Sequence, residues 1–275
     1  MGHPPKNDRT NGTKGGKIIS TVIRSYGWSD TGCVRPQNED RILADDALGL
    51  YVVADGMGGH THGEVAAQLA TDVIHAYIHA SRNLQEITWP FGYNFERSPN
   101  ENRLSTAIHL ASRKVFERAI QMPEMDGMGT TVAAVLLENG MATVASVGDS
   151  RVYLFSGDRL EALTVDDTWV GAMVRQGSLR QSDVAQHPMR NVLTQAAGVR
   201  ENVDLQVLER RLSGGDQLLL TSDGLHGVVG DDRIESALAA GLKLEEAVHR
   251  LIQGAQDEGA PDNVSCVLIR YGITA

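Results

Sequence analysis

Acidic residues recur beside glycine, asparagine or another turn-forming residue at the ends of short apolar segments. They are Glu39, Asp40, Asp55, Asp149, Asp223 and Asp262. A carboxylate at a buried strand end is costly unless a cation, an arginine or hydrogen bonds compensate its charge. Because several buried anions would repel one another, divalent cations are the economical explanation. Ligands that are all oxygen atoms favour Mg²⁺ or Mn²⁺ over zinc.

Each of these acids taken alone is an ordinary turn residue, because aspartate before glycine is common in tight turns. Their repetition at the strand ends of one chain weakens that interpretation. The acids alone do not establish that the strand ends converge on one edge. That step depends on the elements that carry them.

Hydrophobic periodicity predicts those elements. Strands are expected at residues 21–26, 41–44, 48–54, 130–137, 141–147, 151–155, 159–163, 203–210, 216–221 and 264–271. Helices are expected at residues 64–81, 101–122, 169–176, 231–240 and 244–256. Tight hairpin turns are predicted at Asn139-Gly140 and Ser156-Gly157-Asp158. Strands in consecutive blocks indicate antiparallel sheets covered by helices, an α+β domain rather than a Rossmann-type parallel sheet.

Composition limits the classes of function. The chain has 275 residues, with 25 Lys+Arg against 35 Asp+Glu and a net charge of -10. With 41% apolar and 22% charged residues it resembles neither a disordered nor a membrane-embedded protein. The acidic balance argues against nucleic-acid binding, which needs a basic face. Two cysteines exclude a disulfide scaffold, and without a signal peptide or membrane span we expect a cytoplasmic protein.

Two segments differ from the rest of the chain. Residues 1–19 are polar, glycine-rich and net positive, so we expect a disordered tail before a single domain at 20–273. Residues 83–100 contain Trp89, Phe91, Tyr93 and Phe95. We interpret this segment as a loop between two helices that packs its rings on the body of the protein. A docking surface for a partner is the alternative.

Six motifs occur in an order that is similar to one known family. They are Gly32-Cys33-Val34-Arg35-Pro36-Gln37-Asn38-Glu39-Asp40, Val53-Ala54-Asp55-Gly56-Met57-Gly58-Gly59-His60, Met128-Gly129-Thr130-Thr131, Val147-Gly148-Asp149-Ser150-Arg151, Thr221-Ser222-Asp223-Gly224-Leu225 and Pro261-Asp262-Asn263-Val264-Ser265. Together they cover about residues 20–273. The chain resembles the type 2C, metal-dependent protein serine/threonine phosphatases, the PPM family, and its bacterial branch in particular.

The resemblance implies a four-layer α-β-β-α sandwich of two mostly antiparallel sheets, with a dinuclear Mn²⁺ or Mg²⁺ centre at one edge. Its core ligands would be Glu39, Asp55, the Gly56 carbonyl, Asp223 and Asp262. A third, weaker ion would use Asp149 and Asp223, with the backbone carbonyl of Asn191 as a less secure ligand. Asp40 would orient ligands or metal-bound water, and Arg35 would bind the substrate phosphate.

The implied reaction is direct attack on phosphorus by a hydroxide that bridges the two metals, without a phosphoenzyme. Many eukaryotic relatives have histidine directly after the Asp-Gly pair, where this chain has Met57. His60 is then either a general acid or, as we favour, a structural residue. Residues 166–195 match the mobile flap of bacterial members. His187 in that flap either meets substrate or is an ordinary loop histidine.

The resulting hypothesis is a phosphatase for phosphoserine and phosphothreonine in proteins that opposes a bacterial Ser/Thr kinase in signal transduction. Its partners would be phosphorylated proteins, with neither nucleic acid nor membrane. A metal-dependent phosphodiesterase is an alternative that should show a basic groove. A pseudophosphatase acting as a binding module is another, and the loss of a metal aspartate would be its signature.

Overall fold

The computed structural model describes residues 20–58, 62–82, 88–180, 183–184 and 186–274. Its strands are β1 (Ser20–Asp30), β2 (Asp40–Asp45), β3 (Leu50–Met57), β4 (Gly129–Thr130), β5 (Val132–Glu138), β6 (Met141–Val147), β7 (Arg151–Ser156), β8 (Arg159–Ala162), β9 (Gln206–Arg211), β10 (Gln217–Thr221) and β11 (Val264–Thr274). Its helices are α1 (His62–Ala80), α2 (Pro99–Gln121), η2 (Pro123–Met125), α3 (Trp169–Arg175), α4 (Asp223–Val229), α5 (Asp231–Ala239) and α6 (Leu244–Asp257).

The strands form two sheets in which neighbouring strands run antiparallel. One has the order β1-β11-β10-β7-β8 and the other β2-β3-β5-β6-β9, with β4 paired to β3. The hairpins β5–β6 and β7–β8 turn at Asn139-Gly140 and Gly157-Asp158, all four of which have positive φ. Two-residue turns of this kind match the twist of the flanking strands. The predicted hairpins and antiparallel sheets are therefore confirmed.

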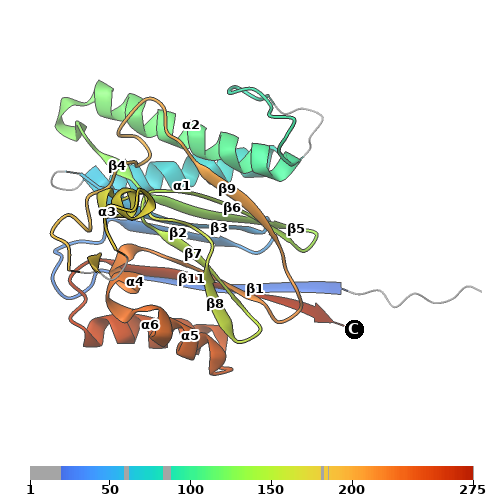
Figure 1. The fold of residues 1–275 in the computed structure, drawn as a ribbon. Helices are drawn as coiled ribbons and strands as arrows, with labels where there is room; N and C mark the ends of the chain where they lie inside the picture. The colour runs from blue at the N-terminus through green and yellow to red at the C-terminus, as the bar shows by residue number, and fades with distance from the viewer. Residues whose placement is uncertain (1–19, 59–61, 83–87, 181–182, 185, 275) are drawn as a thin grey trace, which may run out of the picture.

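The layers follow from which sheet faces are apolar. Helices α1 and α2 cover the outer face of the sheet that contains β3, and α5 and α6 cover the outer face of the sheet that contains β11 (Figure 1). A third apolar cluster, with Tyr51, Val135 and Leu220, lies between the sheets. The α+β four-layer sandwich predicted from the family resemblance is thus what the structure shows.

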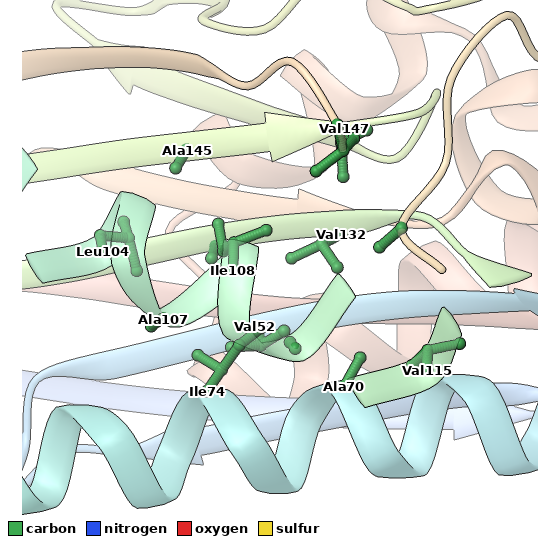
Figure 2. Packing of buried hydrophobic residues seen from close by; sticks show 14 of the residues in the cluster. Val52, Ala70, Ile74, Leu104, Ala107, Ile108, Val115, Val132, Ala145 and Val147 are labelled. Atoms are coloured by element: carbon green, nitrogen blue, oxygen red, sulfur yellow. The ribbon is translucent and has the colours of Figure 1, made fainter. Parts of the chain in front are cut away.

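The core beneath α1 and α2 is made by the inward faces of both helices. Figure 2 shows Ile74 of α1 and Ile108 of α2 near Val52 and Val132 of the sheet, and all four are fully buried. The capping box at Ser98 and Glu101 fixes the start of α2. These helices hold β3 and β5 rigidly, and β3 carries Asp55 near its end.

The predicted start of one strand was wrong, and one α-helix was missed. Strand β9 begins at Gln206 and not at residue 203, because Val203 packs into the core beneath α2 from a loop. Helix α4 was not predicted because it is only seven residues long and contains Gly224 and Gly227, which are poor helix formers. Leu225 and Val229 hold it on the core.

The aromatic segment only partly follows its prediction. Trp89 and Tyr93 are half-buried and their rings make an edge contact at 5.0 Å. The Phe91 ring, 44% exposed, lies 5.3 Å from the His109 ring of α2, whereas Phe95 is 91% exposed and does not pack down on the body as expected. The predicted tail at residues 1–19 lies outside the described residues. Among the helices that the structure describes, none has the length and apolarity that crossing a membrane requires.

Candidate functional site

A cavity of about 450 Å³ opens at the edge of the sandwich where strands of both sheets end. Eight of the residues singled out in the sequence line it: Arg35, Glu39, Asp55, Gly56, Asp149, Asn191, Asp223 and Asp262. They come from the ends of β3, β6, β10 and β11 and from connecting loops. The convergence that the separate motifs left open is therefore observed. We call this space the acidic cavity.

Asp55 and Asp40 are held side by side by strand pairing. They are directly opposite each other in the β2–β3 register. Asp40 is only 1% exposed and lies beneath the cavity rather than in its wall, where Ser222 Oγ donates a hydrogen bond to Asp40 Oδ2 at 2.8 Å. Next to Asp55, Gly56 must lack a side chain, because a Cβ there would lie 2.0 Å from the carbonyl oxygen of Gly63.

Asp149 and Asp223 each follow a buried strand. Asp149 is 8% exposed in the turn between β6 and β7. Asp223 is the first residue of α4, one residue after the end of β10. The turn with Asp149 is tied to the start of the 166–195 segment, because Gly148 N donates to Asp167 Oδ2 and Asp167 N donates to the Gly148 carbonyl. The predicted flap is thus anchored beside one wall of the cavity.

Asn263 holds the loops of the cavity mouth together, and its role was missed in the sequence. Its side chain donates to the carbonyl oxygens of Thr31 and Gln37 and accepts from the backbone N–H of Glu39 at 2.9 Å. Ser222 was missed in the same way. Both lie inside the recognised motifs, but their partners are remote along the chain, so only the fold reveals the contacts.

Arg35 lies at the mouth of the cavity. Its Nη2 donates to Asp262 Oδ2 at 2.7 Å, and its side chain is 52% exposed. This hydrogen bond raises the pKa of the Arg35 guanidinium above its usual value, so the group is permanently charged. The exposed part of the planar guanidinium has donors that can pair with an incoming anion.

The hydroxyl groups in the site motifs form structural hydrogen bonds, mainly with the backbone. Thr130 Oγ1 donates to the Asp55 carbonyl at 2.9 Å, and Thr131 Oγ1 accepts from the Asp55 N–H at 3.0 Å. Thr131 Oγ1 also bonds Ser150 Oγ at 2.6 Å. These hydroxyls fix the end of β3 and are engaged in structural bonds, which does not suit a nucleophile.

Burial and crowding raise the pKa values of the carboxylates in and beneath the acidic cavity. Burial is the main cause that raises the pKa of Asp55, Asp149, Asp223 and Asp40 above the usual carboxyl range. Repulsion between neighbouring carboxylates adds to it. The protein without a bound cation therefore holds these groups at a cost in free energy. A cavity with perturbed acids and few counter-charges is the electrostatic pattern of a functional site.

The donor set fits hard divalent cations. Asp40 Oδ1 and Asp223 Oδ1 are buried and have no hydrogen-bond partner among the described residues. Every predicted ligand offers oxygen, as Mg²⁺ and Mn²⁺ prefer. Within the described part of the chain, however, no three His, Cys, Asp or Glu side chains stand ready-made around one metal position. Carboxylate oxygens from several strand ends nevertheless line one cavity, so it is the chemistry of the donors that fits such cations.

Of the two histidine candidates, His187 lies among the described residues, and it is not in the wall of the acidic cavity. His187 is half-buried in the 166–195 segment, stacks on the Trp169 ring at 5.2 Å and accepts a hydrogen bond from Met189 N through Nδ1. His60 lies outside the described residues. The structure therefore assigns His187 packing contacts within its own loop.

Comparisons with known proteins agree on one family. A family model described as Protein phosphatase 2C matches residues 36–268. The serine/threonine protein phosphatase PstP of Mycobacterium tuberculosis is 34% identical over 253 residues, 91% of this chain and 45% of that protein. The chain thus spans about half the length of PstP. The serine/threonine phosphatase Stp of Listeria monocytogenes is 31% identical over 249 residues, covering 90% of this chain and 95% of that protein.

A solved structure adds information on metal. The catalytic domain of the serine/threonine protein phosphatase PstP in complex with two manganese ions superimposes with a TM-score of 0.78 at 30% identity. The match covers 92% of this chain and all of that domain. The fold of the present chain is therefore that of a protein that binds two manganese ions.

Proposed function

The chain belongs to the protein phosphatase 2C family, and from this membership we propose that it is a metal-dependent phosphatase acting on phosphoserine and phosphothreonine in proteins. One observation carries the proposal. Acids from five separate places in the sequence meet in a single cavity that has an exposed arginine at its mouth. A phosphate monoester has the charge and size to fit between such an arginine and bound cations.

We propose that Mn²⁺ or Mg²⁺ is held in this cavity. The residues that would hold the two core ions are Glu39, Asp55, the Gly56 carbonyl, Asp223 and Asp262. A third, weaker ion would use Asp149, Asp223 and the Asn191 carbonyl. When bound, such ions lower the pKa of a water molecule and neutralise charge on the transferring phosphoryl group.

The remaining chemistry falls to the chain itself. Arg35 orients the phosphate through its free donors and shares its charge between the substrate and Asp262. Asp40 keeps its position through Ser222 and stands opposite Asp55 in the pairing of β2 and β3, from where it would orient that ligand. Asn263 keeps the loops of Glu39 and Asp262 together, so that the two acids stay within one wall.

The wider setting is also a proposal. Residues 20–273 would form one catalytic domain, with residues 166–195 as a flap over the cavity that carries His187. The partners would be phosphorylated proteins and an opposing Ser/Thr kinase of a bacterial cytoplasm. The names of PstP and Stp, both serine/threonine phosphatases of bacteria, support this assignment.

The test is a phosphatase assay on protein stripped of metal. Hydrolysis of p-nitrophenyl phosphate and of a phosphothreonine peptide should be absent after chelation and return with Mn²⁺ or Mg²⁺. The variant Asp262→Asn should lose the metal-dependent activity, while Asp158→Asn should keep it, because Asp158 lies in an exposed hairpin turn. Full activity in the stripped protein would contradict the proposal. Metal binding without any hydrolysis would instead support the pseudophosphatase.

A further inference from the structure

A further cavity lies at the end of the sandwich away from the acidic cavity. Its volume is about 250 Å³, and its wall comes from the β2–β3 turn, the end of β5, α2 and the end of α1. Gly49, directly before β3, lines this cavity, whereas Asp55 near the end of β3 lines the acidic cavity. That length of extended strand separates the two by about 20 Å. The β5–β6 turn and β4 accordingly lie at opposite ends of the molecule (Figure 1). The proposed function does not use this space, which we call the distal cavity.

The wall of the distal cavity contains a buried arginine that lacks an anionic partner. Arg103, the fifth residue of α2, is only 5% exposed. Its Nε is buried and has no hydrogen-bond partner among the described residues. The ion pairs that arginines form in the described part of the chain involve other arginines. A guanidinium stays charged in proteins, and burying a charge is costly unless an anion pairs with it. Arg103 therefore has donors that the chain itself does not use.

The two acids in the wall do not neutralise Arg103. Asp46 and Glu138 are both exposed, and neither forms an ion pair with an arginine of the described chain. Asp46 Oδ1 accepts a hydrogen bond from the Tyr51 hydroxyl at 2.9 Å, and Glu138 Oε2 accepts one from the Asn100 amide at 2.8 Å. Water and salt screen exposed charges of this kind, whereas a charge withdrawn from water acts more strongly on its surroundings. The buried guanidinium is thus the charge that an occupant of the cavity would meet.

A second guanidinium belongs to the same wall. Arg82, two residues after the end of α1, donates through Nη2 to the Ala47 carbonyl, which ties it to the β2–β3 turn. Leu136 and Leu137 of β5 are buried in the wall, and their side chains offer no acceptor to either arginine. A planar guanidinium pairs well with two oxygens of a carboxylate or a phosphate. We propose that the distal cavity binds a small oxyanion, a carboxylate or phosphate group, which pairs with Arg103 and is contacted by Arg82.

The first test measures the binding of inorganic phosphate and of acetate by isothermal titration calorimetry. The protein is stripped of metal and free of chelator, and chloride keeps the ionic strength constant. We expect at least one of the two anions to bind, and Arg103→Met to raise its Kd at least tenfold. Tighter binding of phosphate than of acetate would show that both arginines take part, and similar affinities would show that Arg103 suffices. Binding of neither anion at about 10 mM would overturn the inference.

Two control variants locate the bound anion. Arg118→Met removes an exposed arginine from the last turn of α2, which does not line the distal cavity, and should leave Kd unchanged within about twofold. Arg35→Ala should also keep the binding, because Arg35 lies at the mouth of the acidic cavity. If Arg35→Ala abolishes binding while Arg103→Met keeps it, the anion binds in the acidic cavity and the inference is wrong. Neither test measures hydrolysis, so a failure of the proposed function would leave this inference standing.

The second test is thermal unfolding with and without the anion. Without it, Arg103→Met should melt at or above the wild-type Tm, because an apolar side chain of similar length replaces an unpaired buried cation. The anion at about ten times its Kd should raise the wild-type Tm by roughly 3 °C and leave that of Arg103→Met unchanged. A lower Tm for Arg103→Met without the anion would show that the protein itself satisfies Arg103, which contradicts the inference. If Arg103→Met does not fold, Arg103→Lys replaces it and should raise Kd at least threefold, because lysine lacks the planar fork. An unchanged Kd in Arg103→Lys would then overturn the inference.

Discussion

The acidic cavity and the surroundings of Arg151 treat carboxylates in opposite ways. Arg151 donates to both oxygens of Asp166, each at 2.8 Å, and also to the Tyr153 hydroxyl, which in turn donates to Asp231. In the acidic cavity one arginine bonds one of five acids. Around Arg151, the chain's own groups pair with the acid. In the acidic cavity, the charge of the carboxylates is left to be neutralised by a bound ligand.

The difference shows that the two regions contribute differently to the stability of the folded state. A paired acid, such as Asp166, contributes to the folded state as soon as the chain folds. The cavity acids have raised pKa values because burial and mutual repulsion disfavour their ionised forms. Their placement is explained by binding and not by stability, as is common at functional sites. The predictions that follow test this contrast.

The largest effect is expected for Asp223→Asn, which removes a charge from the acidic cavity. Asp223 is proposed to serve both the core ions and the weaker ion, so kcat/KM on a phosphopeptide should fall about a thousandfold, or roughly 4 kcal/mol. Steady-state kinetics at saturating Mn²⁺ measures it, with Asp158→Asn as control. Retention of more than a tenth of the activity would mean that Asp223 is no metal ligand.

A smaller effect, on stability, is expected for Arg151→Met. It leaves Asp166 without its guanidinium, with about a quarter of each side chain exposed. Breaking a fully buried pair costs 3–5 kcal/mol, and partial exposure reduces this to about 2 kcal/mol of the free energy of unfolding. Urea unfolding measures it. The double variant Arg151→Met with Asp166→Asn should lose less free energy of unfolding than the two single variants lose together. Losses that simply add up would contradict the pairing of Arg151 with Asp166.

The pH dependence of metal-free stability should reflect the cavity acids. Groups whose pKa is raised in the folded state bind more protons there than in the unfolded chain, so the free energy of unfolding falls as pH rises. We expect a loss of about 1 kcal/mol per pH unit from pH 5.5 to 7.5. Saturating Mn²⁺ should weaken or reverse this trend, because cations compete with protons. Urea unfolding at each pH measures it, and a metal-free stability that rises over this range would contradict the repulsion.

The smallest effect is expected for Arg35→Ala. Because the Arg35 side chain is half-exposed and bonds Asp262 at the mouth of the cavity, its loss should raise KM for a phosphopeptide about fivefold and change kcat less. Mn²⁺ should bind somewhat more tightly, since Asp262 is released. Arg35→Lys should recover part of the affinity. A fall in kcat alone, with KM unchanged, would place Arg35 in a different role.

The sequence predicted most of the fold and the composition of the cavity. Strand ends marked by Asp55, Asp149, Asp223 and Asp262 could be read because each acid follows or precedes an apolar run beside a turn. Their convergence was supplied by the family resemblance, and the structure shows it. Helix α4 was missed because two glycines conceal a helix that only tertiary packing stabilises.

What the sequence did not predict depends on contacts between remote residues. The hydrogen bonds of Asn263 to Thr31 and Gln37 span more than two hundred residues. The close approach of Gly198 to Val115 depends on the left-handed backbone of Gly198, and no local pattern marks that approach. The exposure of Phe95 was mispredicted because aromatic composition alone does not reveal whether a ring has a surface to pack on.

The central claim is that the acidic cavity sacrifices stability in order to hold cations. The most direct test is the thermal unfolding temperature of metal-stripped wild type and Asp55→Asn, each with and without Mn²⁺. Removing one repelling charge should raise the Tm of the stripped variant above that of the stripped wild type by about 3 °C. Mn²⁺ should then raise the Tm of the wild type but not that of the variant. A stripped Asp55→Asn protein that melts below the stripped wild type, or that gains as much from Mn²⁺, would contradict the account.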